Sequence, residues 1–194
     1  MTKPKIIGLT GSIGMGKSTV AAMFTEAGIP VFDADAEVRR LQGPGGELVS
    51  AIEAAFPGST GPDGVDRDRL GKQVFADKAA LARLEAIVHP AVAARRVAFL
   101  ETHHDKRAVV FDIPLLFERG GHEAVDLVVV VSAPEAVQRA RVLVRPGMTP
   151  EKFAHIFGLQ LHDSHKRERA HHIIDTGTSL DETRAQVVAL IASI

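Results

Sequence analysis

The chain has 194 residues, which is long enough to bury one good core and fits a single domain that carries an insertion. Its 23 basic and 24 acidic residues leave a formal net charge of -1, so no overall field attracts it to nucleic acid or to an anionic membrane. The absence of cysteine excludes disulfides and thiolate metal sites, and the absence of Trp and Tyr argues against a platform that stacks nucleic-acid bases. The first apolar run is too short for a signal peptide or a membrane span. We therefore expect a cytoplasmic protein, a monomer or weak homo-oligomer, that binds neither nucleic acid nor membrane.

Apolar runs and helical spacings alternate along the chain. In chain order they predict a strand at residues 5–10, a helix at 18–27 that Gly28 ends, a strand at 29–32, mostly helix from about 36 to 100, strands at 108–113 and 127–131, helices from about 135 to 170, a strand at 172–175 and a helix from about 180. Strands that alternate with helices imply a parallel sheet with right-handed crossovers. The expected fold is therefore α/β with three layers, and ligands should bind at the carboxyl ends of the strands.

The long helical stretch contains two breaks and one proline. Residues 43–46 and 57–64 are rich in turn-forming residues, and the stretch has few strand signals. His89 precedes Pro90, and a residue before proline is disfavoured in the helical conformation. The sequence therefore predicts that a helix ends at His89.

The segment between the first strand and the first helix satisfies the pattern G-x-x-x-x-G-K-[ST], which in this context predicts a P-loop. It consists of Gly11, Ser12, Ile13, Gly14, Met15, Gly16, Lys17 and Ser18, with Thr19 directly after it. Its glycines allow a tight turn in which successive N–H groups face phosphates, and the helix N-terminus adds favourable potential. Lys17 would neutralise the β- and γ-phosphates of ATP, and the Ser18 hydroxyl would bind Mg²⁺. The sequence therefore predicts a site for ATP and Mg²⁺ in an enzyme that transfers the terminal phosphoryl group to a small acceptor.

Three aspartates follow predicted strands. Asp33 and Asp35 come after the second strand, and we favour Asp33 as the residue that orients an acceptor hydroxyl and accepts its proton. For Asp35 a functional role and a helix-capping role are equally open. Asp112 ends the apolar run at residues 109–111, where it could help to hold the metal through water or could be a turn residue before Pro114.

Basic residues are concentrated in the helical stretch from about 135 to 170. Arg141 and Arg145 are four residues apart, so they share one face if this segment is a helix. Two guanidinium groups on one face could close on ATP phosphates as part of a lid, although solvated surface arginines would give the same pattern. The histidines other than His89 lack a spacing that would bring metal ligands together, and we interpret them as surface residues.

The motifs of this chain resemble those of the dephospho-CoA kinase family over nearly the whole length. The resemblance is carried by residues 8–19, Asp33-Ala34-Asp35, Arg39, residues 63–67, Leu70, Val74-Phe75, residues 87–90, residues 114–118, Gln160, residues 173–175 and Gly177. It implies a three-layer P-loop NTPase fold in one domain, with a core at about residues 1–35, 106–134 and 171–194, a helical acceptor-binding insertion at about 36–105 and a helical lid at about 135–170.

The resemblance also implies an activity and a set of residues. Members of the family phosphorylate the ribose 3′-hydroxyl of dephospho-CoA with ATP, which gives CoA and ADP in the last step of coenzyme A synthesis. The resemblance implies that ATP is bound by the P-loop with Thr19 and by Arg145 and Asp175. It implies that Lys17 and Arg141 are catalytic residues. For dephospho-CoA, the resemblance implies that Asp33 is the base and that Arg39, His89 and Leu115 bind the substrate.

Other functions stay open. The P-loop does not identify the acceptor, so a kinase of the nucleoside monophosphate or shikimate type is the first alternative. The second is a regulatory or RNA-binding module that uses ATP as a signal, which the near-neutral charge and the lack of an aromatic RNA-reading patch disfavour. A GTPase is less favoured still, because the sequence contains no N-K-x-D motif.

Overall fold

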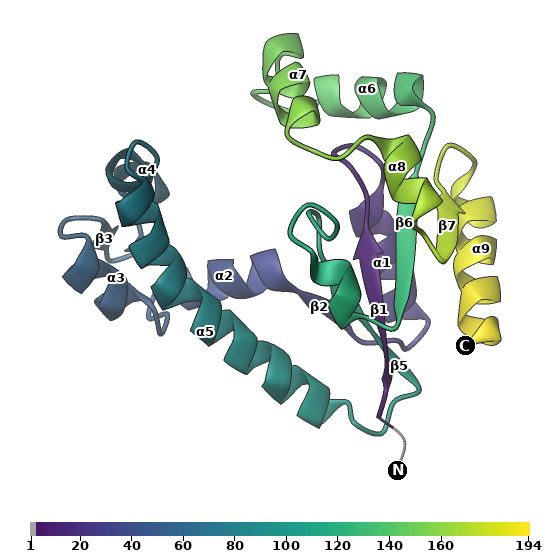
Figure 1. Ribbon diagram of the computed structural model, residues 1–194, viewed down its shortest axis with the longest axis horizontal. Helices are drawn as coiled ribbons and strands as arrows, with labels where there is room; N and C mark the ends of the chain where they lie inside the picture. The colour runs from purple at the N-terminus through teal and green to yellow at the C-terminus, as the bar shows by residue number, and fades with distance from the viewer. Residues whose placement is uncertain (1–2) are drawn as a thin grey trace. The chain divides into compact units, whose positions relative to one another are not determined.

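Figure 1 shows the computed structural model of the protein, which describes residues 3–194. The chain divides into two compact units. The first contains the residues up to Phe32 together with His103–Ile194, and the second is Asp33–Thr102. No helix within residues 3–194 is both long and apolar enough to cross a membrane. The functional division into core, insertion and lid stays a prediction.

The first unit is built around a sheet of five strands in the order β2-β5-β1-β6-β7 (Figure 1). The strands are β1 (Lys5–Thr10), β2 (Val31–Asp33), β5 (Ala108–Asp112), β6 (Leu127–Ser132) and β7 (His172–Asp175). β1 runs parallel to β5 and to β6, and β6 runs parallel to β7. Each predicted strand is present, and the predicted α/β fold with a parallel sheet is confirmed.

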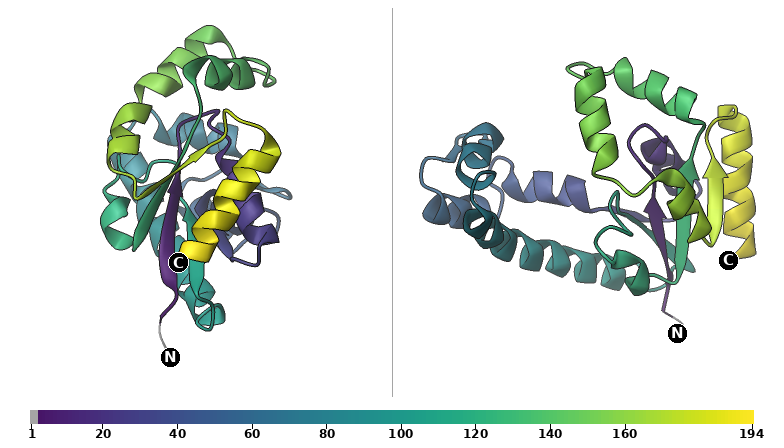
Figure 2. Two further views of the ribbon diagram at one scale, coloured as in Figure 1. Left: turned by 90° about the vertical axis from the view of Figure 1, so that its right-hand side faces the viewer. Right: turned by 45° about the horizontal axis from the view of Figure 1, so that its top comes forward.

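The helices of the first unit lie on the faces of this sheet and beyond one of its ends (Figures 1 and 2). They are α1 (Lys17–Glu26), the 3₁₀ helix η1 (Gly121–Ala124), α6 (Glu135–Leu143), α7 (Pro150–Gly158), α8 (Asp163–Glu168) and α9 (Leu180–Ser193). Helices α1 and α9 pack against each other on one side of the sheet, as Figure 2 shows, and α8 packs against β6. The first unit therefore has the layered arrangement of an α/β fold.

Alternation along β6 shows how the two faces of the sheet are filled. Val129 and Val131 belong to one buried cluster, together with side chains from β1, α1 and α9. Val128 and Val130 belong to a second cluster with Leu116, which lies in the segment after β5. Successive side chains of a strand point to opposite faces, so β6 contributes to both clusters.

The second unit is mostly helical. Its elements are α2 (Ala34–Gln42), α3 (Val49–Ala55), β3 (Thr60–Gly61), β4 (Gly64–Val65), α4 (Arg67–Val74) and α5 (Lys78–Thr102). Their apolar sides meet in a buried cluster that includes Leu41, Ile52 and Phe56. The turn-rich residues 57–64 contain most of a short antiparallel hairpin, β3 with β4, which the sequence did not predict. Strands of two residues are too short to show a periodic apolar pattern.

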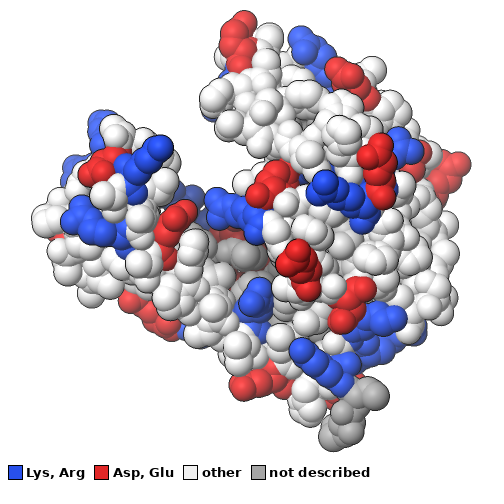
Figure 3. All heavy atoms as spheres, in the orientation of Figure 1, with Lys and Arg blue, Asp and Glu red and all other residues white. Residues whose placement is uncertain are grey.

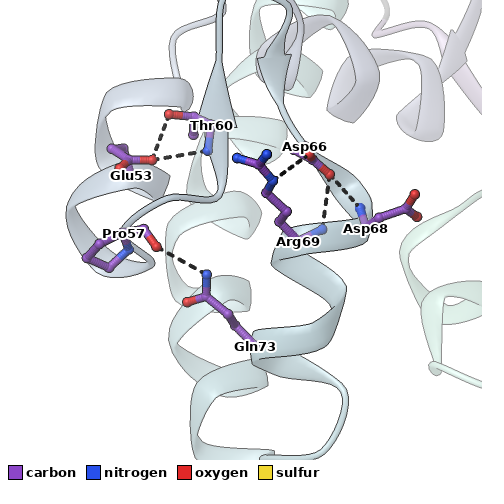
Figure 4. A network of polar contacts seen from close by, with 7 residues as sticks. All are labelled: Glu53, Pro57, Thr60, Asp66, Asp68, Arg69 and Gln73. Atoms are coloured by element: carbon purple, nitrogen blue, oxygen red, sulfur yellow. Dashed lines mark hydrogen bonds and ion pairs between the residues drawn. The ribbon is translucent and has the colours of Figure 1, made fainter.

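Side-chain carboxylates hold this hairpin and the start of α4 (Figure 4). The Glu53 carboxylate accepts hydrogen bonds from the Thr60 N–H at 3.1 Å and from the Thr60 hydroxyl at 2.7 Å. The Asp66 carboxylate accepts hydrogen bonds from the N–H groups of Asp68 and Arg69, at 3.1 and 3.0 Å, and therefore caps α4. Local polar bonds thus shape a segment that has little apolar pattern of its own.

Helix α5 runs through Pro90, so the predicted helix end at His89 is wrong. Proline cannot donate a hydrogen bond to the carbonyl of Ala86, a loss that contributes to a cost of about 3 kcal/mol inside a helix. His89, Pro90 and Ala86 all lie on the exposed face of α5, where water can bind the freed carbonyl. The opposite face packs against α2, α3 and α4, and this packing outweighs the local preference of the His-Pro pair.

A buried ion pair attaches α8 to the segment that follows β5. The Lys166 side chain is fully buried, and its ammonium nitrogen lies 2.9 Å from a carboxylate oxygen of Glu118. The same oxygen accepts a hydrogen bond from the Leu161 N–H at 2.8 Å. Burial alone raises the pKa of Glu118, but the Lys166 ammonium and the Leu161 N–H together outweigh burial and lower it. The folded protein therefore favours the charged form of Glu118.

We predict that Glu118→Gln lowers the free energy of unfolding by about 3 kcal/mol, because it leaves the Lys166 ammonium buried without a counter-charge. Urea unfolding followed by circular dichroism measures this change. Because the pKa of Glu118 is lower in the folded state, its contribution is present above the unfolded pKa and is lost as the pH falls through the folded pKa.

The matched control is the double variant Glu118→Leu with Lys166→Met, which removes both charges and should retain most of the stability. Equal unfolding midpoints for Glu118→Gln and the unsubstituted protein would show that the pair does not stabilise the fold.

Candidate active site

The P-loop, residues 11–18, joins the carboxyl end of β1 to α1. Gly14 and Gly16 have φ angles of 80° and 85°, in the left-handed region that favours glycine. Gly16 is the N-cap residue of α1, and no side chain caps the first N–H groups of this helix. Such N–H groups, together with the helix dipole, form a binding site for anions.

Both glycines are also places where the loop touches other parts of the first unit. A Cβ atom on Gly14 would lie 2.5 Å from a methyl carbon of Val142 and 2.9 Å from the Gln138 carbonyl oxygen. A Cβ atom on Gly16 would lie 3.1 Å from the Thr176 hydroxyl oxygen. The loop therefore fits closely against α6 on one side and against the residue after β7 on the other.

Lys17 and Asp112 form an ion pair between the first residue of α1 and the last residue of β5. Both side chains are largely buried, with exposed fractions of 17% and 8%. The pair brings together the residue predicted to neutralise phosphates and the residue predicted to assist the metal. Asp112 ends β5, and Lys17 follows the loop after β1, the strand that pairs with β5.

The oxygen atoms at this place suit Mg²⁺. This ion prefers oxygen ligands, and proteins usually hold it with one or two groups, several waters and substrate phosphates. The Ser18 hydroxyl and the Asp112 carboxylate are groups of this kind. Within residues 3–194 no group of three or more His, Cys, Asp or Glu side chains could hold a metal ion.

A cavity of about 670 Å³ opens over the P-loop. This volume lies within the range of small-molecule sites, about 300–1,000 Å³. Residues 11–19 all line the cavity, and so do Arg141 and Arg145. The other lining residues are Pro114, Ile156, Gln160, Thr176, Thr178, Leu180 and Thr183. The structure thus brings together most of the residues predicted for the nucleotide.

Asp175 and Leu115 were also predicted as site residues, but neither of them lines this cavity. Asp175 ends β7, and its carboxylate accepts a hydrogen bond from the Gly177 N–H at 2.7 Å, which shapes the turn after the strand. Leu115 follows β5 and is half-buried next to Pro114, which does line the cavity. The roles of Asp175 and Leu115 stay predictions.

Thr176 holds Arg141 against the P-loop. Arg141 donates one hydrogen bond to the Thr176 hydroxyl at 3.1 Å and another to the Thr176 carbonyl at 2.7 Å. The Thr176 hydroxyl in turn donates to the carbonyl of Met15 at 2.7 Å. One buried threonine therefore connects the P-loop backbone with an arginine of α6.

Arg145 lies beyond the end of α6, so the condition under which it would share a helix face with Arg141 is not met. The helix ends at Leu143 because Arg145 precedes Pro146, and a residue before proline is disfavoured in the helical conformation. The Arg145 N–H instead closes a turn on the Val142 carbonyl at 3.1 Å. Both arginines line the cavity despite this difference.

Most residues predicted for the acceptor lie in the second unit. The Asp33 carboxylate caps α2 by accepting a hydrogen bond from the Ala36 N–H at 2.9 Å, and it lies 3.5 Å from a guanidinium nitrogen of Arg39. Asp35 is exposed in the first turn of α2, and His89 is exposed on α5. The structure therefore brings Asp33 and Arg39 together and assigns the N-cap to Asp33.

Two residues that shape the site were missed by the sequence reasoning. Thr176 follows β7 directly, so the rule that ligands bind at the carboxyl ends of strands could have identified it. Gln138 lies on α6 and donates a hydrogen bond to the carbonyl of Ile13, 125 positions away in the sequence. No local pattern marks such a residue, because its partner is a backbone atom.

Comparisons with known proteins agree with this geometry. The sequence model of the family described as dephospho-CoA kinase matches residues 5–182. A dephospho-CoA kinase of Novosphingobium aromaticivorans is 63% identical over 194 residues, which cover 100% of this chain and 96% of the relative. A dephospho-CoA kinase of Mesorhizobium japonicum is 55% identical over 188 residues, which cover 96% of this chain and 94% of the relative.

Solved structures share the fold. The protein TT1252 of Thermus thermophilus has a TM-score of 0.84 and 34% identity, and the match covers 100% of this chain and 99% of that one. A shikimate kinase of Acinetobacter baumannii has a TM-score of 0.54 and 19% identity, and the match covers 98% of this chain and 94% of that one. The second likeness concerns the fold alone.

A parallel sheet with a P-loop after its central strand, and with arginines around the same cavity, defines a P-loop kinase of the small-molecule type. Fold, loop and cavity agree on this class. The chain belongs to the dephospho-CoA kinase family. The family resemblance and the prediction of a phosphotransferase are therefore confirmed.

We predict that Gly14→Ala abolishes measurable ATP binding, because the added Cβ would enter space occupied by Val142 and by the Gln138 carbonyl. Isothermal titration calorimetry with ATP and Mg²⁺ measures the loss. Gly28→Ala is the matched control: Gly28 also has a φ of 80°, but within residues 3–194 only its own chain neighbours lie within 4 Å of the added carbon. It should cost roughly 1–2 kcal/mol of backbone strain and leave ATP affinity unchanged. Normal ATP binding by Gly14→Ala would contradict the close fit of loop and helix.

Proposed function

We propose that this protein transfers the γ-phosphoryl group of ATP to the ribose 3′-hydroxyl of dephospho-CoA and releases CoA and ADP. The observation that supports this most is a P-loop that shares one cavity with Arg141, in a chain that matches the dephospho-CoA kinase family over residues 5–182. A P-loop does not identify an acceptor, so the acceptor assignment depends on the family.

Phosphoryl transfer requires positioning and charge stabilisation more than covalent chemistry from the protein. In the proposed mechanism the P-loop N–H groups and Lys17 hold the β- and γ-phosphates, and the Arg141 guanidinium stabilises charge on the transferred group. Arg141 suits this role because its hydrogen bonds to Thr176 already order the side chain. Arg145 lines the same cavity and would add a second cation.

Mg²⁺ is the proposed cofactor. The Ser18 hydroxyl would hold it, and the Asp112 carboxylate would assist directly or through water. When bound, the metal neutralises charge on the β- and γ-phosphates and orients them. Since Asp112 is also paired with Lys17, the same carboxylate would help to position the lysine for the phosphates.

Asp33 is the proposed general base. The 3′-oxygen would attack the γ-phosphorus while the bond from that phosphorus to the β–γ bridging oxygen breaks, and the hydroxyl proton would pass to Asp33. Asp33 is the last residue of β2, and carboxyl ends of parallel strands are where α/β enzymes bind ligands. Its side chain is 43% exposed and therefore accessible to an acceptor. Arg39, His89 and Leu115 are proposed to bind the rest of dephospho-CoA.

The helices α6, α7 and α8 are proposed to act as a lid. Arg141, Arg145, Ile156 and Gln160 belong to this stretch and line the cavity. Figure 2 shows α6 and α7 beyond the end of the sheet from which the P-loop emerges. A closed lid would exclude water from the γ-phosphate and so prevent wasteful hydrolysis of ATP.

The distribution of surface charge favours small molecules as the binding partners. Lys and Arg side chains are interspersed with Asp and Glu on the face in Figure 3, and the formal net charge of the chain is -1. We therefore propose that the partners are ATP and dephospho-CoA, without nucleic acid or membrane. The protein would work in the cytoplasm as a monomer or weak homo-oligomer.

The acceptor is tested by incubating the purified protein with ATP and separating ADP and CoA by chromatography. Dephospho-CoA, AMP, shikimate and no acceptor are compared, each with Mg²⁺ and with excess EDTA. We predict ADP release only with dephospho-CoA and Mg²⁺, with CoA formed in equal amount. Turnover with AMP or shikimate alone would remove the acceptor assignment, and equal ADP release without any acceptor would remove the proposed lid.

We predict that Asp33→Asn lowers kcat by roughly 10²-fold or more, the usual contribution of a general base, while ATP affinity changes little. Lys17→Ala should damage both kcat and ATP affinity, because Lys17 would contact the phosphates. Asp66→Asn is the matched control, since Asp33 and Asp66 are both helix N-caps and Asn caps equally well. Unchanged turnover in Asp33→Asn would remove the base assignment.

A further inference from the structure

The backbone of Ile13, in the P-loop, is held from two sides by glutamine side chains. The Ile13 N–H donates a hydrogen bond to Oε1 of Gln160 at 3.0 Å, and Nε2 of Gln138 donates to the Ile13 carbonyl at 2.7 Å. Gln138 lies on α6 and is 1% exposed, whereas Gln160 follows α7 and is half-buried. Both polar groups of one residue therefore depend on the proposed lid.

These bonds replace what regular secondary structure would supply. Residues 11–16 belong to neither a helix nor a strand, so their N–H and carbonyl groups need other partners. Within the loop, the Met15 N–H bonds to the Ser12 carbonyl at 3.1 Å, but this turn leaves both groups of Ile13 to other partners. The two glutamines provide these partners.

We propose that Gln138 and Gln160 are positioning residues for phosphoryl transfer, which fix Ile13 and thereby hold the P-loop N–H groups in the geometry that binds ATP. The pair acts through the loop backbone, and we call it the Ile13 clamp. This inference rests on the proposed function, because it concerns the binding of ATP to the same loop. It predicts that an ordered loop depends on α6 and on the end of α7.

The test uses the full chain and near-isosteric variants without polar side-chain atoms, Gln138→Met and Gln160→Met. The Ile13 N–H should exchange with solvent at least about tenfold faster in Gln160→Met, because the loss of one hydrogen bond is worth roughly that factor. NMR hydrogen exchange of that single amide measures it. A thermal melt of each variant verifies that it folds, and if the buried Gln138→Met does not fold, Gln160→Met alone decides the test.

Kinetics provide the second measurement. A loosened loop must be ordered when ATP binds, so Gln160→Met should raise the KM for ATP by roughly five- to tenfold. The kcat and the KM for dephospho-CoA should change by less than about twofold. The loop becomes ordered when ATP binds, before the transition state is reached, and the clamp does not contact the acceptor. Gln73→Met is the matched control: it removes an exposed glutamine on α4 that donates to the Pro57 carbonyl, and it should change nothing.

Two further variants separate the clamp from general damage. Gln160→Glu replaces the amide oxygen by a carboxylate oxygen, which can still accept from the Ile13 N–H, so it should restore slow exchange of that amide. The double variant Gln138→Met with Gln160→Met should raise the KM for ATP by less than the product of the single effects, because both side chains hold one residue. Independent, multiplicative effects would mean that the two glutamines do not act as one clamp.

The outcomes distinguish this inference from the proposed function. Hydrogen exchange and calorimetric titration with ATP need no acceptor, so they decide the clamp even if dephospho-CoA is not a substrate. An Ile13 N–H that exchanges equally fast in Gln160→Met and in the unsubstituted protein overturns the clamp, whatever the activity. Fast exchange with unchanged ATP affinity overturns its role in positioning.

Discussion

Two glycines in the left-handed conformation set the shape of the phosphate site, and the rest of the site is arranged around them. Gly14 and Gly16 turn the chain between β1 and α1 through φ angles that other residues avoid. Each glycine also lies against a distant part of the first unit, Gly14 against α6 and Gly16 against Thr176. The loop is therefore not a free turn, because its shape depends on helices and strands that come more than a hundred residues later.

The parallel sheet explains why these distant parts meet. Carboxyl ends of parallel strands lie at one edge, so the residues that follow or end β1, β5 and β7 reach the same place. They are the P-loop, Asp112 and Thr176. Since β1 is the central strand, the P-loop has a partner on each side. Asp112, at the end of the neighbouring β5, pairs with Lys17, and Thr176, after β7 on the other side of β6, connects Met15 with Arg141. One topological rule thus assembles a cavity from residues that are far apart in the chain.

The sequence predicted those features that are encoded locally. Each strand of the main sheet is a short apolar run, and the P-loop is a contiguous motif, so both could be read without the structure. The continuation of α5 through Pro90 could not, because it depends on packing against other helices. Gln138 could not be recognised as part of the site, because it bonds to a backbone atom of the P-loop and leaves no pattern at its own position. For Thr176 the only signal was its place directly after β7, which says nothing of its hydrogen bond to Met15.

A nearly neutral protein can bind a triphosphate because the charges that matter are local. The formal net charge is -1, and basic and acidic side chains are mixed on the face in Figure 3. At the cavity, by contrast, Lys17 is largely buried and Arg141 is held by two hydrogen bonds, so both cations are already ordered. Partly buried charges are screened by salt less than exposed ones. Such an arrangement favours a compact polyphosphate in one cavity and gives the outer surface no general attraction for polyanions, which is what a kinase with two small-molecule substrates requires.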